Sequence, residues 1–279
     1  MLTSLLLLTV NLKTARPSWT SQVAGYRLEK WSRQDPDDLE TFYIKDRRGH
    51  VVTALHDFRI TPYFDNKVQV LDLNHDGVPE VLLSTWTGGA HGGCSYYIWS
   101  LGLHPRCILA YDKVNIGLEH DFEFVDLDGD GIPEIRTWYD GYYYTVSGSY
   151  WPDLPIILKL VHGRYVERTY RFRKVLRQAA HWSWIDFQKE SGHEGFRSYY
   201  INPINLLAIG DMLGDRETVW RRLRRIMTNS NYRWLKHNES LVFEILRRRK
   251  DRYQYPKPYD LRPVAWVPLS EDLTSKLNE

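Results

Sequence analysis

The chain has 279 residues, enough for one large domain or two modest domains with a buried core. Its 43% hydrophobic and 26% charged residues are typical of a folded soluble protein, and a net charge of +2 argues against a nucleic-acid-binding domain. Only two cysteines are present, Cys94 and Cys107, which excludes a disulfide framework. The 11 Trp and 19 Tyr residues favour a strand-rich structure.

The first 20 residues are predicted to be a signal peptide. Leu2–Val10 is an apolar run of nine residues, too short to span a bilayer but long enough for the apolar core of a signal. The pattern is incomplete, because no Lys or Arg precedes the run and Lys13 precedes the candidate cleavage site at Ala15. We expect the mature chain to begin between Ala15 and Val23, and we expect no transmembrane segment.

A β domain is predicted over residues 24–171, and its first part contains three strand-like segments. Tyr26–Trp31 is one strand, and Thr41–Lys45 and His50–Leu55 form a hairpin around Asp46–Gly49. This segment is a candidate first repeat that lacks the acidic loop of the two repeats that follow.

An acidic nonapeptide occurs twice, at Asp72–Glu80 and at Asp126–Glu134, 54 residues apart and with six of nine positions identical. Oxygen-bearing side chains stand at its first, third, fifth and ninth positions, and glycine stands at the sixth, where a sharp turn is needed. These carboxylates repel one another unless a cation lies among them, and a cation with six to eight oxygen ligands is calcium before magnesium. The alternative is a pair of Asx-rich turns without an ion.

The loops are not EF-hands, because the twelfth positions are Leu83 and Thr137 instead of a bidentate glutamate. A strand–loop–strand unit with this motif resembles the FG-GAP/VCBS-type repeat of propeller-like extracellular proteins, over about residues 65–160. The resemblance implies two repeats, at about 65–112 and 119–162, each with one calcium site. The implied ligands, with backbone carbonyls at the seventh position, are Asp72, Asn74, Asp76, Val78 and Glu80 in the first loop and Asp126, Asp128, Asp130, Ile132 and Glu134 in the second. Because the second loop carries four carboxylates and the first carries three, we expect tighter binding in the second.

Each repeat is predicted to supply two strands around its loop and two later strands, which is the make-up of a propeller blade. The later strands are predicted at Ser95–Leu101 and Cys107–Tyr111, and at Tyr142–Ser147 and Pro155–Val161. A closed propeller needs at least four blades, or roughly 216 residues at this period, which is more than the β-rich stretch provides. We therefore expect two blade-like sheets packed face to face, with the hairpins of residues 26–60 covering one edge.

Two further features of the repeats are the cysteines and the strand connections. A turn near Gly102–Pro105 places Cys94 opposite Lys113 instead of Cys107, so we expect two free thiols. The glycine-rich Thr87–Cys94, with His91 at its tip, is interpreted as a bulge or long turn more readily than as a ligand site. The matching place in the second repeat holds the aromatic Tyr139–Tyr144, which is typical of variable recognition loops on a common scaffold.

The region 172–279 is predicted to be a smaller α-helical part with a Pro-rich tail from Tyr253, which makes the chain α+β overall. Predicted helices are Phe172–Lys189, a helix capped by Asn202 with Pro203 at its first position and running to Leu213, a helix capped by Asp215, and Ser240–Arg249. The apolar stripe of the third helix consists of Val219, Leu223, Ile226 and Met227.

The arginines of the predicted third helix lie on the side away from its apolar stripe, where a solvated face is normal, so we expect no nucleic-acid partner. None of the common catalytic motifs is present. The sequence favours a calcium-stabilised binding or adhesion module without catalytic activity, secreted, periplasmic or on the cell surface. Its partner would be an extracellular protein or a glycan. The alternative is a secreted carbohydrate-active or other hydrolytic enzyme whose active site the sequence does not identify.

Overall fold

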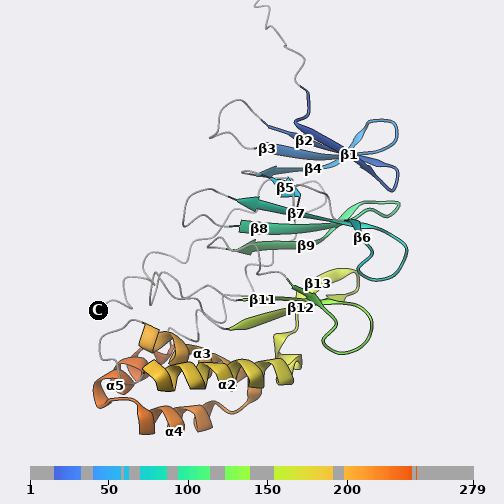
Figure 1. The fold of residues 1–279 in the computed structure, drawn as a ribbon. Helices are drawn as coiled ribbons and strands as arrows, with labels where there is room; N and C mark the ends of the chain where they lie inside the picture. The colour runs from blue at the N-terminus through green and yellow to red at the C-terminus, as the bar shows by residue number, and fades with distance from the viewer. Residues whose placement is uncertain are drawn as a thin grey trace, which may run out of the picture.

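The computed structural model stacks three antiparallel sheets in chain order and ends with helices (Figure 1). This confirms the predicted fold class, a β-rich N-terminal part followed by a smaller helical part. The residues that the structure describes are 16–32, 40–57, 60–62, 70–86, 94–113, 123–138, 154–190, 198–240 and 243.

The first sheet has four strands in sequence order. They are β1 (Trp19–Val23), β2 (Tyr26–Trp31), β3 (Glu40–Lys45) and β4 (Val51–Asp57). Three of them agree with the prediction, whereas β1 was not predicted because its residues overlap the expected signal peptide. The segment is therefore a four-stranded unit with one strand more than predicted, and its assignment as a first repeat without the acidic loop stays a hypothesis.

The second sheet contains five strands, two of them very short. They are β5 (Thr61–Pro62), β6 (Val70–Leu71), β7 (Glu80–Trp86), β8 (Cys94–Ser100) and β9 (Arg106–Lys113). Because β5 and β6 both pair with β7, on the edge that β8 leaves free, they lie end to end and act as one interrupted strand. The sheet therefore has four strand positions, like the first.

The third sheet again runs in sequence order. Its strands are β10 (Glu123–Val125), β11 (Glu134–Trp138), β12 (Pro155–Val161) and β13 (Arg164–Glu167). β12 has the predicted bounds, but it pairs directly with β11, so the predicted strand Tyr142–Ser147 is not the third strand of this sheet. That segment lies outside the described residues, and the fourth strand is β13, which was not predicted.

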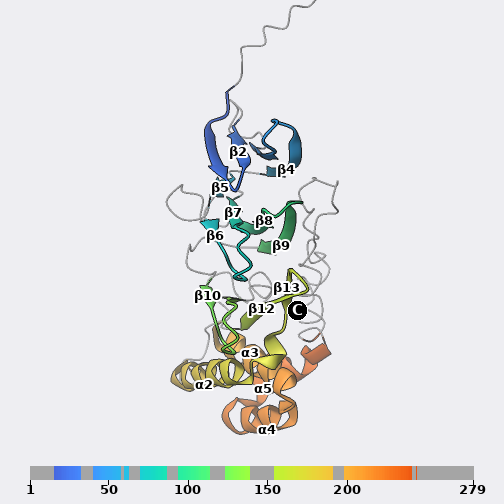
Figure 2. The same ribbon diagram turned by 90° about the vertical axis from the view of Figure 1, so that its right-hand side faces the viewer.

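The second sheet is buried on both faces because its strands carry apolar side chains at successive positions. On β7, Val81 and Leu83 face the first sheet, whereas Leu82 packs with residues of the third sheet and the helices. On β8, Tyr97 and Ile98 divide in the same way. The second sheet is thus a central layer between two cores, as its stacked position in Figures 1 and 2 shows.

The expectation that the first hairpins cover only an edge is wrong. Leu28, Phe42 and Ile44 of the first sheet are buried against Val81 and Trp99 of the second, so the two sheets pack face to face. The physical reason is the alternation along β2 and β3, which gives this sheet one continuous apolar face. The buried Asp57 on β4 also links the first sheet to the second by hydrogen bonds. Its Oδ2 accepts from Thr85 Oγ1 at 2.9 Å and from Tyr97 Oη at 3.1 Å.

Below the third sheet, the described part of the chain includes a short 3-10 helix and four α-helices (Figure 1). They are η1 (Thr169–Arg171), α2 (Arg173–Glu190), α3 (Ser198–Leu213), α4 (Arg216–Ile226) and α5 (Asn229–His237). Their apolar sides join the core of the second and third sheets through residues such as Leu176, Leu207 and Leu223. Within the part of the chain that the structure describes, none of the helices combines the length and apolar character that a membrane crossing requires.

The helices correct several sequence predictions. α3 begins at Ser198, so Pro203 lies inside the helix instead of at its first position, at the expense of one backbone hydrogen bond. In α4, Ile226 belongs to the predicted apolar stripe but is 36% exposed. The core instead contains Trp220, which was not part of the predicted stripe. α5 was not predicted, although Thr228 marks its start by accepting a hydrogen bond from the N–H of Asn231. The predicted helix Ser240–Arg249 and the Pro-rich tail lie almost wholly outside the described residues.

The cysteine prediction agrees with the structure where it can be compared. The register of β8 and β9 places Cys94 opposite Lys113 and Cys107 opposite Trp99. Cys107 is a buried free thiol, and burial raises its pKa to about 12. This thiol is therefore protonated and unreactive near neutral pH.

Candidate metal centre

The two acidic nonapeptides form equivalent loops at equivalent places in neighbouring sheets. Loop 1, residues 72–80, connects β6 to β7, and loop 2, residues 126–134, connects β10 to β11. Both loops project from the same side of the stack, at the right in Figure 1 and toward the viewer in Figure 2. The repeat seen in the sequence is thus a repeat in space.

Three backbone hydrogen bonds are the same in both loops. The aspartate at the first position accepts from the glycine N–H at the sixth, at 3.0 Å for Asp72 and 3.0 Å for Asp126. The aspartate at the fifth position accepts from the N–H at the seventh, at 2.8 Å in loop 1 and 2.9 Å in loop 2. The glutamate at the ninth position accepts from the N–H at the second, at 2.8 Å in both loops. These bonds fix one oxygen of each carboxylate and orient the carboxylates within the loop.

The backbone conformation explains two glycine positions. Gly77 and Gly131, at the sixth position, have φ values of +76° and +82°, in the left-handed region that favours glycine. The fourth position also has a positive φ, +81° at Gly129 but +55° at His75. At the fourth position, loop 1 therefore has a residue with a Cβ, which is strained at a positive φ, whereas loop 2 has glycine, which is not strained there. The sequence of loop 2 is thus better adapted to this turn.

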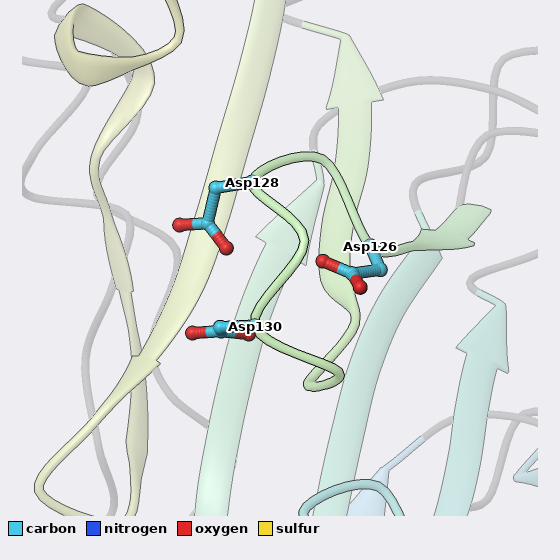
Figure 3. A group of neighbouring side chains, drawn as sticks. All are labelled: Asp126, Asp128 and Asp130. Carbon is cyan, nitrogen blue, oxygen red and sulfur yellow. The ribbon is translucent and has the colours of Figure 1, made fainter.

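Loop 2 brings three carboxylates together. One oxygen from each of Asp126, Asp128 and Asp130 lies within 4.8 Å of the others, and all three residues are exposed at the bends of the loop (Figure 3). Carboxylate oxygens are the ligands preferred by hard cations, so this triad could hold a metal ion.

A lysine from the neighbouring strand already reaches into loop 2. Lys159 Nζ on β12 donates hydrogen bonds of 2.7 Å each to Asp128 Oδ2, Asp130 Oδ2 and Glu134 Oε1. Burial alone would lower the pKa of Lys159, but these three acceptors outweigh it and raise that pKa. In turn the Lys159 ammonium, helped by the N–H of Ile132, lowers the pKa of Asp130. Lysine is therefore a charged partner of the loop 2 carboxylates.

Among the described residues, no lysine or arginine reaches the glutamate of loop 1. Glu80 is 1% exposed, and while Oε2 accepts from the N–H of Leu73, Oε1 is buried without a hydrogen-bond partner of good geometry. Burial, and to a smaller extent the charges of Asp76 and Asp72, raise the pKa of Glu80, against the lowering effect of the Leu73 N–H and the Ser100 hydroxyl. A buried carboxylate oxygen without a partner is costly, and a cation in the loop would remove that cost.

The third position of loop 1 also differs, because Asn74 replaces an aspartate. Its amide Nδ2 donates to Asp76 Oδ2 at 2.7 Å, and its Oδ1 accepts from the N–H of Asp76 at 3.3 Å. The assignment of amide oxygen and nitrogen follows from this network, and a rotation of the amide would present an oxygen to a cation instead.

The predicted ligands thus fall into two groups. The structure joins Asp128, Asp130 and Glu134 around one ammonium group, with Asp126 in the same carboxylate triad, and among the described residues it gives Glu80 no counter-charge. Ligation of calcium by these residues, by Asp72, Asn74 and Asp76, and by the carbonyls of Val78 and Ile132 stays a prediction.

Sequence reasoning missed Lys159. The only available signal was a single charged residue in the otherwise apolar strand Pro155–Val161, 25 residues after Glu134. The strand pairing brings it back to the loop, since Ile135 lies opposite Leu158 and the next pair in this register is Glu134 and Lys159.

Other sequence candidates give no second site among the described residues. His91 with its glycine-rich segment and the aromatic segment Tyr139–Tyr144 lie outside them. Four of the five α4 arginines make contacts within the protein; for example, the Arg222 guanidinium lies 4.5 Å from the ring centroid of Trp184, and Arg224 Nη1 lies 2.7 Å from Asn229 Oδ1. The expected absence of a nucleic-acid partner stays a prediction.

Comparison of the chain with protein-family models, with curated proteins and with solved structures found no significant match. The functional assignment therefore depends on the geometry of the two loops.

Proposed function

We propose that the protein is a calcium-stabilised, extracytoplasmic binding or adhesion module without catalytic activity, built from repeats that resemble the FG-GAP/VCBS type. The observation that carries this proposal is the shared cradle, in which three equivalent backbone N–H groups orient the carboxylates of both loops. Such preorganised oxygens in loops that join two strands suit an ion whose role is structural.

The fit of the residues to a cation is best tested at Glu80. Its buried Oε1 has no hydrogen-bond partner of good geometry among the described residues, and the charges of Asp72 and Asp76 raise the pKa of the Glu80 carboxyl. A divalent cation would supply the missing positive charge to this group. With six to eight oxygen ligands in a flexible arrangement, calcium suits a loop of carboxylate, amide and carbonyl oxygens better than magnesium, which demands near-ideal octahedral geometry.

The proposed location follows from the metal, since calcium loops of this kind function where calcium is plentiful. The N–H of Ser18 donates a hydrogen bond to Lys30 O, and β1 begins at Trp19, so these residues are part of the first sheet region. We therefore propose that a leader, if cleaved, ends before Ser18, in the first part of the expected window from Ala15 to Val23. The proposed partner is an extracellular protein or a glycan.

Metal analysis and thermal melting test the calcium proposal. Purified full-length protein, dialysed against calcium and then against metal-free buffer, should retain bound calcium as measured by elemental analysis. Melting in excess calcium should occur at a higher temperature than in chelator, because a ligand at about 100 times its dissociation constant stabilises the folded state by about 2.7 kcal/mol. Equal melting temperatures in calcium, magnesium and chelator, with no retained metal, would refute the proposal.

The binding role needs a separate test. Calcium-loaded protein should bind a defined set of ligands on a glycan array or an array of extracellular proteins. Retained turnover of a polysaccharide, with no binding on either array, would favour the hydrolytic alternative.

A further inference from the structure

The two loops face different residues at one equivalent position of the next strand. In the second sheet Glu80 is paired with Ser100 on β8. In the third sheet the register of β11 and β12 brings Glu134 to Lys159, whose Nζ is 2.7 Å from Glu134 Oε1. A neutral hydroxyl group in one repeat thus corresponds to an ammonium group in the other.

Lys159 satisfies loop 2 in the way a bound ion would. Its ammonium group has three N–H donors, and three carboxylates accept from them at 2.7 Å each. Hydrogen bonds between charged groups are about twice as strong as neutral ones. Two of the acceptors, Asp128 and Asp130, belong to the carboxylate triad that could hold a metal ion, so the ammonium group and an ion in this triad would compete for the same carboxylates.

Among the described residues, no side-chain cation reaches loop 1. The Ser100 hydroxyl beside Glu80 is neutral and cannot balance the charge of a carboxylate, and Glu80 Oε1 is buried without a hydrogen-bond partner of good geometry. The same atom in loop 2, Glu134 Oε1, receives Lys159. The comparison is close because the backbone hydrogen bonds of the two loops agree within 0.1 Å, at 3.0 and 3.0, 2.8 and 2.9, and 2.8 and 2.8 Å.

We propose that Lys159 is an internal cation that takes the place of calcium in loop 2, so that the chain binds one calcium ion, in loop 1. This inference rests on the proposed function, because it presumes that a loop of this kind binds calcium at all. It reverses the order expected from counting carboxylates, since loop 2 has more of them but also carries its own counter-charge. To enter loop 2, calcium would have to displace the ammonium group of Lys159, a side chain that is 17% exposed and forms three charge-assisted bonds.

The first test is the calcium stoichiometry of the full chain by isothermal titration and equilibrium dialysis. The wild type should bind one calcium ion per chain. Lys159→Met removes the ammonium group but keeps most of the aliphatic stem, so this variant should bind two. The control is Lys189→Met on α2, because Lys189 is 71% exposed and pairs with Asp186 far along the chain from either loop, so one ion should remain.

Exchanging the residues at positions 100 and 159 gives a second test, which does not depend on the folding of Lys159→Met. Ser100→Lys places an ammonium group opposite Glu80 and should abolish calcium binding in loop 1, leaving no bound ion. The double variant Ser100→Lys and Lys159→Ser should bind one ion again, now in loop 2. If Lys159→Met unfolds in chelator, its recovery of structure on adding calcium, followed by circular dichroism, supports the same conclusion.

The outcomes separate the two proposals. Two calcium ions in the wild type would overturn the role of Lys159 while leaving the calcium function intact. One ion in both the wild type and Lys159→Met would also overturn the inference, because removing the lysine would then have opened no site. No calcium in any of these proteins would refute the proposed function, and the inference that depends on it would fail for that separate reason.

Discussion

Loop 1 and loop 2 have the same backbone cradle but differ in the residue that faces the buried glutamate. In loop 2 Glu134 binds Lys159, and in loop 1 the equivalent oxygen of Glu80 has no partner. The sequence of each loop thus determines how its carboxylates are arranged, whereas a residue on the neighbouring strand determines whether a side-chain ammonium group balances their charge. The nonapeptide sequences alone do not show this difference between the two loops.

The comparison is tested most strongly at Glu80. Glu80→Gln should lose most of the stabilisation by calcium, which is about 2.7 kcal/mol when calcium is at 100 times its dissociation constant. In chelator the variant should be at least as stable as the wild type, because it no longer buries an ionised carboxylate with one oxygen left without a well-formed hydrogen bond. Chemical denaturation with and without calcium measures both effects. A variant that keeps the full calcium effect would show that the ion is elsewhere.

Glu134→Gln should behave in the opposite way. In chelator it should lower the free energy of unfolding by about 2 kcal/mol, because the fully buried Glu134 loses a charge-assisted bond to Lys159. The stabilisation by calcium should stay close to that of the wild type, since loop 1 is intact. Denaturation under the same two conditions provides the measurement, and a loss of the calcium effect here would place the ion in loop 2.

The fourth position offers a smaller contrast. Gly129→Ala should cost about 1 kcal/mol, because the residue has a φ of +81°, although nothing lies within 4 Å of the added Cβ. His75→Gly at the same position of loop 1 should change stability by less than about 0.5 kcal/mol, since relief of strain is offset by the larger entropy of the unfolded chain. Denaturant titration of both variants in chelator measures these changes in the free energy of unfolding. Changes of equal size would contradict the inference that loop 2 is the better adapted turn.

The smallest effects concern protonation. In chelator the pKa of Glu80 should lie above its ordinary value, so its contribution to stability is complete below that value and is lost as pH rises through the raised pKa. The pKa of Asp130 should lie below its ordinary value, so its contribution is lost as pH falls through the lowered pKa. Carboxyl carbon shifts in NMR titrations measure both groups. Calcium should lower the pKa of Glu80 and leave that of Asp130 nearly unchanged.

Local patterns explain how much of the fold could be predicted. The alternating strands and the turn residues located β2, the hairpin of β3 and β4, and β12 within a residue or two, and the nonapeptides located both loops. Pro203 misled the prediction of α3, because proline is favoured in a first helical turn and is tolerated deeper only when packing compensates. The candidate strand Tyr142–Ser147 lies outside the described residues, and it is not the partner of β11, because β12 pairs with β11 directly.

The carboxylates of the candidate site could be predicted from the sequence, but the ammonium group that balances their charge in loop 2 could not. Asp126, Asp128 and Asp130 are recognisable from their spacing, since one turn of the loop brings them together. Lys159 is not recognisable in this way, because only the register of two strands far apart in the sequence brings its ammonium group to Glu134. The packing of the first sheet on the second was hidden for the same reason, since it depends on which faces meet and not on any local pattern.

The two apolar faces of the second sheet have a consequence for cooperativity. This sheet contributes Val81 and Tyr97 to one core and Leu82 and Ile98 to the other, so neither neighbouring layer can separate without exposing apolar surface of the central layer. Partly unfolded states in which one sheet has opened are therefore costly, and the three sheets should unfold as a single unit. Because loop 1 begins at an edge strand of this central sheet and ends at β7, an ion held there would stabilise the whole stack against unfolding, and not one repeat alone.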